Sequence, residues 1–160
     1  MAAGANIVLL ALGNDILGDD GVAFEAAKLL EARFAGRVDI VRSSEAGLAL
    51  LELLEGYDRA LLLDAIVSGK RPVGSIVEMG PEDFRAVIAP SPHYAGLPEV
   101  LALAERLEIA FPAQLRVLAL EVADPFVLRE GLTPEVAAAV PALVERAANI
   151  LEGWTCTSTA

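Results

Sequence analysis

Three aspartates and one histidine stand at positions in this sequence where they could do chemistry. Asp19 and Asp20 are adjacent and follow a glycine-rich turn, whereas Asp64 ends a run of aliphatic residues. His93 is the only histidine of the chain and lies in a Ser-Pro-His-Tyr segment. Two carboxylates and an imidazole can bind a divalent transition metal and leave coordination positions open. These residue types therefore predict a metal-binding site formed by the Asp19–Asp20 pair, Asp64 and His93.

Each of these residues also has a structural interpretation. Capping of a helix and interaction with its dipole would account for one of the two adjacent aspartates. Asp64 could be a turn residue that leaves a strand, although burial of an unpaired carboxylate is costly. A single loop histidine is usually incidental, so the pattern alone leaves both interpretations open.

The turn before the acids differs from a nucleotide-binding loop. It reads Gly-Asn-Asp-Ile-Leu-Gly-Asp-Asp-Gly over residues 13–21, with neither G-x-G-x-x-G nor a Walker lysine. Its acids would repel a pyrophosphate. Asn14 could orient this turn or donate to a substrate carbonyl.

Alternating apolar runs and helical periodicities place these residues in an α/β fold. The predicted strands cover 6–12, 38–41, 60–65, 75–79 and 115–120, and the predicted helices cover 20–35, 45–55, 96–109 and a last segment from 133. Such alternation favours a mostly parallel sheet with helices on both faces. Asp20 and Asp64 would then share the carboxyl edge, where α/β sheets bind ligands. Glu45 would open its helix and interact with the dipole, and Thr133 would cap the last helix.

Composition limits the function classes. The 160 residues suit a single domain, expected over 1–152 with a C-terminal tail at 153–160. The net charge of −11 disfavours nucleic acid and anionic membranes as partners. No apolar run has the length of a membrane span, and no basic segment precedes the first one, so we expect a cytoplasmic protein. Cys156 is the only cysteine, which excludes an internal disulfide, and no histidine near it in sequence could activate it.

Five short segments, in order along most of the chain, resemble the nickel–iron hydrogenase maturation endopeptidases. They are Gly13-Asn14, Asp19-Asp20-Gly21, Asp64-Ala65, Pro92-His93 with Gly96-Leu97, and Gly131-Leu132-Thr133-Pro134. The resemblance implies a five-stranded twisted sheet between helices. It also implies an enzyme that removes a C-terminal peptide from the precursor of the hydrogenase large subunit after nickel insertion.

The family's metal-contacting residues correspond here to Asp20, Asp64 and His93, and the nickel they recognise is carried by the substrate precursor. Members have Glu or Asp at the first of these positions, and this chain has the shorter side chain. Some members have Gly-Gly-Thr after the second strand, where this chain has Ser43-Ser44-Glu45, which bears on substrate specificity.

Water is the expected nucleophile, because no serine or cysteine has a general base visible in the sequence and the histidine is assigned to the metal. Asp20 and Asp64 would then act both in catalysis and in metal recognition.

Two other functions fit the same acids. A nickel-binding chaperone or adaptor would hold the metal without cutting a protein. A phosphoacceptor receiver domain also pairs acids after its first strand with an aspartate at the end of its third. That domain needs a lysine after its last strand, where this chain has Glu121-Val122-Ala123-Asp124-Pro125.

Overall fold

The computed structural model describes residues 5–83 and 97–157. The helices and strands in chain order are β1 (Ile7–Leu12), η1 (Gly18–Gly21), α1 (Val22–Phe34), β2 (Asp39–Ser43), α2 (Ala49–Leu54), β3 (Arg59–Ile66), β4 (Ile76–Met79), α3 (Leu97–Arg106), β5 (Gln114–Glu121) and α4 (Pro134–Cys156). Each of the five predicted strands is present, and η1 is a single 3-10 turn that leads directly into α1.

The strands form one sheet in the order β2-β1-β3-β5-β4. The β1, β2, β3 and β5 pairings are parallel, whereas β4 is antiparallel to β5. This confirms the predicted mostly parallel sheet of five strands. A receiver domain has the flavodoxin-like order 2-1-3-4-5. The different order and the antiparallel β4 therefore make the receiver interpretation wrong.

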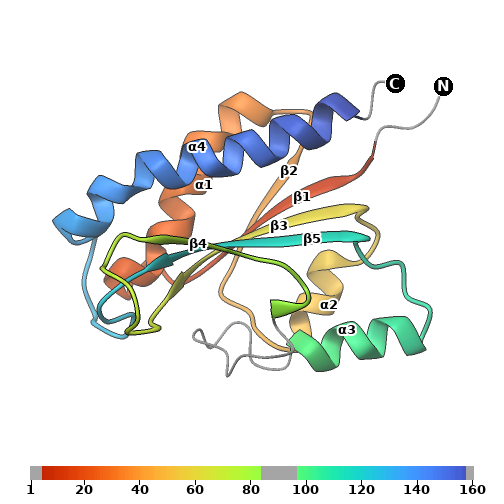
Figure 1. The fold of residues 1–160 in the computed structure, drawn as a ribbon, viewed down its shortest axis with the longest axis horizontal. Helices are drawn as coiled ribbons and strands as arrows, with labels where there is room; N and C mark the ends of the chain where they lie inside the picture. The colour runs from red at the N-terminus through yellow and green to blue at the C-terminus, as the bar shows by residue number, and fades with distance from the viewer. Residues whose placement is uncertain (1–4, 84–96, 158–160) are drawn as a thin grey trace.

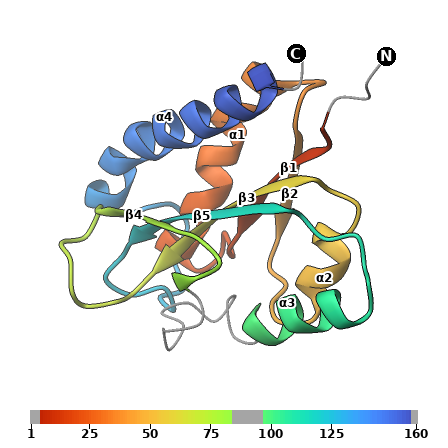
Figure 2. The same ribbon diagram turned by 45° about the vertical axis from the view of Figure 1, so that its right-hand side comes forward.

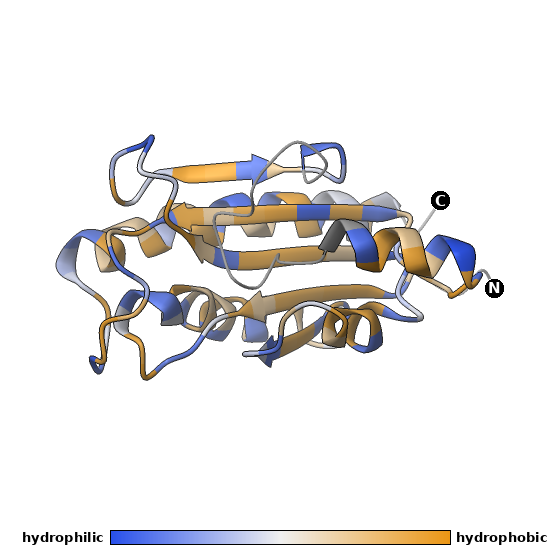
Figure 3. Cartoon of the chain, turned by 90° about the horizontal axis from the view of Figure 1, so that it is seen from below, coloured by the Kyte–Doolittle hydropathy of each residue, from blue (hydrophilic) through white to orange (hydrophobic). Residues whose placement is uncertain are grey.

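Helices cover both faces of the sheet, as the alternation predicted. In Figure 1, α1 and α4 lie above the strands and α2 and α3 lie below them, and the turned view of Figure 2 agrees. The strands at the centre of the sheet are mostly hydrophobic in Figure 3 because both of their faces are covered. Successive strand residues point to opposite faces, so each face of the sheet has its own hydrophobic core. Leu61, Leu63 and Ala65 of β3 pack in the core beneath α1 and α4. Leu62 and Ile66 pack in the core on the α2 and α3 side.

The topology singles out one edge of this sheet. After β1 the chain passes through α1 to β2 on one side, then through α2 to β3 on the other side of β1. The carboxyl ends of β1 and β3 therefore form a topological switch point, where open α/β sheets leave a crevice for ligands.

Two of the boundaries that differ from the sequence prediction change an interpretation. The helix expected over 45–55 begins only at Ala49, so Glu45 lies outside its first turn and the dipole interpretation of Glu45 is wrong. At the other end of the chain, α4 continues to Cys156 and buries Trp154, so residues 153–156 form its last turn. No helix in the described ranges is long and apolar enough to cross a bilayer.

Candidate active site at the carboxyl edge of β1 and β3

A glycine allows η1 to approach the end of β1. Gly13 follows β1 directly and donates its N–H to the carbonyl of Ser43, the last residue of β2. A Cβ atom on residue 13 would lie less than 3.0 Å from the carbonyl oxygen of Asp20. Glycine is therefore the residue that fits this position without displacing the backbone, and the absence of a side chain lets Asp20 come close to the end of β1.

Asn14 orients the turn that follows. Its side-chain Oδ1 accepts the N–H of Ile16 at 3.2 Å, and its carbonyl accepts the N–H of Leu17 at 3.2 Å. The Asp20 N–H then donates to the Leu17 carbonyl at 3.2 Å. This network confirms the first of the two roles considered for Asn14, because an Asx-type turn fixes the chain where it enters η1.

The two adjacent aspartates have different surroundings. Both carboxylates of η1 are buried. The Asp19 carboxylate accepts the Thr133 N–H at 2.7 Å and the Thr133 hydroxyl at 2.9 Å. Neither η1 nor α1 has a side-chain cap, so the capping interpretation of Asp19 is wrong. Asp19 instead ties the turn after β1 to the start of α4.

Thr133 is the N-cap residue of α4, as the sequence predicted, but its side chain makes no capping bond within that helix. Its hydroxyl is used in the bond to Asp19. The Asp19 carboxylate also satisfies the backbone N–H of Thr133, so a residue from a distant segment supports this helix start.

Asp20 and Asp64 lie at the switch point. Asp20 is 5% exposed and Asp64 is fully buried, and η1 contacts β3. The position of Asp64 between Leu62 and Ile66 in β3 directs its side chain to the α2 and α3 side of the sheet. Its Oδ1 accepts the backbone N–H of Ala65 at 2.8 Å. Two buried carboxylates at one sheet edge need a cation or donors to offset their charge.

His93, the third member of the predicted set, lies outside the described residues. Within the described ranges, no group of three His, Cys, Asp or Glu side chains could hold a metal ion. The two described carboxylates therefore offer oxygen ligands but no complete metal site. A divalent transition metal would need a further ligand from elsewhere, and carboxylate with imidazole is a suitable donor set.

Glu121, at the end of β5, is a buried carboxylate whose role the sequence did not indicate. It accepts the N–H groups of Ser68 and Gly69 at 2.8 and 2.9 Å, and the Ser68 hydroxyl at 2.8 Å. These three donors satisfy the carboxylate and hold the segment that follows β3. Its partners are 52 and 53 residues away in sequence, so no local pattern could have revealed this role.

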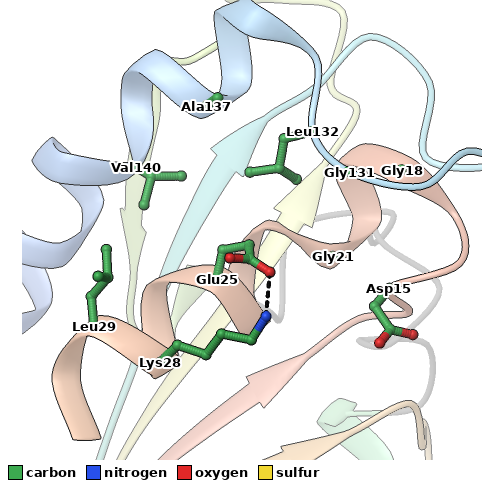
Figure 4. A pocket seen from close by; sticks show the side chains of 10 residues that line it. All are labelled: Asp15, Gly18, Gly21, Glu25, Lys28, Leu29, Gly131, Leu132, Ala137 and Val140. Carbon is green, nitrogen blue, oxygen red and sulfur yellow. Dashed lines mark hydrogen bonds and ion pairs between the residues drawn. The ribbon is translucent and has the colours of Figure 1, made fainter. Parts of the chain in front are cut away.

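A cavity of about 550 Å³ lies on the opposite face of the sheet, beside η1. Figure 4 shows it between α1 and the start of α4, with Leu29, Leu132 and Val140 on its walls. Lys28 and Glu25 form an ion pair within it at 2.6 Å. Neither Asp20 nor Asp64 lines this cavity, and Asp64 points to the other face of the sheet.

The lone cysteine is far from these carboxylates. Arg59, the first residue of β3, donates to the Trp154 carbonyl and the Thr157 hydroxyl, so the end of α4 lies at the amino edge of the sheet. Asp64 is five residues further along β3, or roughly 16 Å. Cys156 is exposed at that amino edge, and a thiol there cannot act together with Asp64.

Comparison with known proteins gives consistent matches over most of the chain. Residues 24–150 match the family model described as HycI: Hydrogenase maturation protease. The chain is 33% identical over 153 residues to the Hydrogenase 2 maturation protease of Escherichia coli strain K12, with 91% of each sequence covered.

Solved structures agree with these sequence matches. The hydrogenase maturating endopeptidase HybD from E. coli superposes with a TM-score of 0.78 at 28% identity, covering 92% of this chain and 93% of that one. The hydrogenase maturation protease HybD from Thermococcus kodakarensis gives 0.69 at 29% identity, covering 91% and 99%.

Proposed function

Because the chain belongs to the hydrogenase maturation protease family, we propose that it removes a C-terminal extension from the precursor of a nickel–iron hydrogenase large subunit. Cleavage would follow nickel insertion, and the nickel would belong to the substrate. The observation that supports this most is the pair of buried carboxylates, Asp20 and Asp64, at the switch point of the sheet.

In this proposal Asp20, Asp64 and His93 recognise the nickel. Two neighbouring carboxylates repel each other when both are charged, and burial strengthens that repulsion. A divalent cation carried by the precursor would offset both charges at once. A precursor without nickel would lack this cation, so the site favours the loaded substrate.

Hydrolysis in this site needs one water and no covalent enzyme intermediate. The water oxygen adds to the scissile carbonyl carbon and gives a proton to a carboxylate of the Asp20–Asp64 pair. The C–N bond then breaks, and the leaving amine takes up that proton. A cation beside the scissile carbonyl would stabilise the oxyanion that forms.

The experiment that tests this function is mass spectrometry of a hydrogenase large-subunit precursor after incubation with the protein. We expect loss of a C-terminal peptide from the nickel-loaded precursor and none from the nickel-free one. Asp20→Asn and Asp64→Asn should abolish cleavage, and His93→Ala should do the same.

A matched control is Glu55→Gln, which changes an exposed carboxylate just after α2, towards the amino edge. It should cleave like the parent protein. Retained cleavage by Asp20→Asn and Asp64→Asn would contradict the proposal. Nickel binding by a folded protein that cleaves neither precursor would instead indicate the adaptor function.

A further inference from the structure

Two loops at the carboxyl edge form an apolar surface that the pair of buried carboxylates does not use. Ile16, Phe126, Val127 and Leu128 are between 48% and 77% exposed. We refer to these four residues as the edge patch. Figure 3 shows hydrophobic segments in the loops beyond the carboxyl ends of the strands. Single exposed apolar residues need no explanation, but several on adjoining loops mark interaction sites on soluble proteins.

Backbone hydrogen bonds hold the two loops together. The Gly18 N–H donates to the Arg129 carbonyl at 3.0 Å, and the Arg129 N–H donates to the Ile16 carbonyl at 3.1 Å. The Phe126 N–H donates to the Asp124 carboxylate at 2.8 Å. The surface is therefore ordered before any partner arrives, which lowers the entropic cost of binding.

The edge patch is linked to the proposed active site through η1. Leu17 adjoins Ile16 and directly precedes η1, and its carbonyl accepts the N–H of Asp20. The Asp19 carboxylate ties η1 to Thr133, in the segment that follows the second loop. A protein that presents a peptide bond to Asp20 must therefore lie beside these loops.

Charges around the edge patch indicate the chemistry of its partner. Asp15 precedes Ile16, and Asp124 and Glu130 flank the second loop, where Arg129 is the only basic residue of 124–130. The whole chain carries a net charge of −11. A complementary surface would be apolar at its centre and basic around its rim, because like charges placed opposite one another suppress association.

We propose that the edge patch is the docking surface for the folded body of the precursor, outside the segment that is cut. This inference rests on the function proposed above. The active site contacts the scissile bond, and the edge patch contacts an apolar surface with a basic rim on the same substrate. Docking there would bring the C-terminal segment to Asp20 and Asp64.

The nickel-free precursor allows a direct test, since by the proposed function it is not cut, and the docking surface lies outside the segment that is cut. We expect Phe126→Ser/Leu128→Ser to raise its dissociation constant at least tenfold, measured by calorimetry. On the nickel-loaded precursor, kcat/KM should fall by a similar factor, while kcat at saturation stays unchanged. Binding by the parent should also weaken as salt increases.

Leu107→Ser is the matched control, because Leu107 is an apolar residue of 59% exposure that follows α3 near the amino edge. It should bind and cleave like the parent. If Phe126→Ser/Leu128→Ser does the same, the docking proposal is wrong. If the parent forms a dimer that this double variant dissociates in sedimentation, the edge patch binds a second copy and the proposal is equally wrong.

These outcomes are distinct from failure of the proposed function. If the parent binds the nickel-free precursor but cleaves neither form, the protease function fails. The binding comparison between the double variant and Leu107→Ser still decides whether the edge patch is the docking surface.

Discussion

The contact between Asp19 and Thr133 should stabilise the fold by an amount that a double-mutant cycle can measure. A hydrogen bond to a charged group contributes about 1.5–3 kcal/mol to stability. Asp19 accepts two such bonds, at 2.7 and 2.9 Å, and is buried. We therefore expect Asp19→Ala to lower the free energy of unfolding by about 3–5 kcal/mol, because it also leaves the Thr133 N–H without its acceptor.

Asp19→Asn should cost less, about 1 kcal/mol, since its amide oxygen still accepts the backbone N–H and its amide nitrogen can donate to the Thr133 hydroxyl. Thr133→Val removes only the hydroxyl and should cost about 1.5–3 kcal/mol. The cycle formed by Asp19→Ala, Thr133→Val and the double variant should give a coupling energy of about 1–2 kcal/mol.

Urea unfolding at neutral pH measures these values. Asp15→Ala is the control, because Asp15 is exposed in the same turn and its loss should change stability by about 0.5 kcal/mol or less. Additive effects of Asp19→Ala and Thr133→Val would refute the direct bond between the two side chains. A cost of Asp19→Ala no larger than that of Asp15→Ala would refute its structural role altogether.

Three further substitutions test the backbone and the response to pH. Gly13→Ala should lower stability by about 1–3 kcal/mol in thermal unfolding and impair cleavage, because its Cβ would collide with the Asp20 carbonyl. Gly153→Ala, in α4 with no atom near the added Cβ, should raise stability by about 0.5–1 kcal/mol, and the opposite ranking would contradict this argument. Burial and the hydrogen bond to Asp39 raise the pKa of Tyr57 above its ordinary 10.0, so the folded state favours the neutral phenol. The contribution of this phenol to stability is complete below pH 10 and is lost as the pH rises through its folded-state pKa. In urea unfolding above pH 10, the free energy of unfolding should therefore fall less in Tyr57→Phe than in the parent protein. Equal losses in the two proteins would refute the coupling.

The layout of the sheet could be predicted from the sequence because its central strands are uniformly aliphatic. The aliphatic runs before Gly13 and through Asp64 are buried on both faces. In a small α/β domain such a run is typical of a central strand that helices cover on both sides. The position of Asp64 at the carboxyl edge followed from the same pattern. The antiparallel direction of β4 could not be predicted, because the composition of a four-residue strand does not indicate in which direction it runs.

Long-range polar contacts account for what the sequence could not show. Glu45 is an acidic residue of the kind that favours the first turn of a helix, but the helix after β2 begins four residues later. Its N–H donates to the Ser43 side chain, a local bond that competes with helix formation. In the sequence, Glu121 is simply a polar residue at the end of a strand. Its three hydrogen-bond donors are apparent only in the fold, where residues 68–69 lie beside the end of β5.

The adjacent acids Asp19 and Asp20 show why a motif cannot assign its own roles. In a 3-10 turn, successive side chains point about 120° apart, so two neighbouring aspartates cannot share one partner. Asp19 reaches Thr133, 114 residues away, and accepts two hydrogen bonds from it. Asp20 is the acid of η1 that we propose for the site beside β3, the strand that η1 contacts. The Asp-Asp motif therefore contains one acid with a structural contact, and the role that we propose for the other, Asp20, is tested by the Asp20→Asn variant.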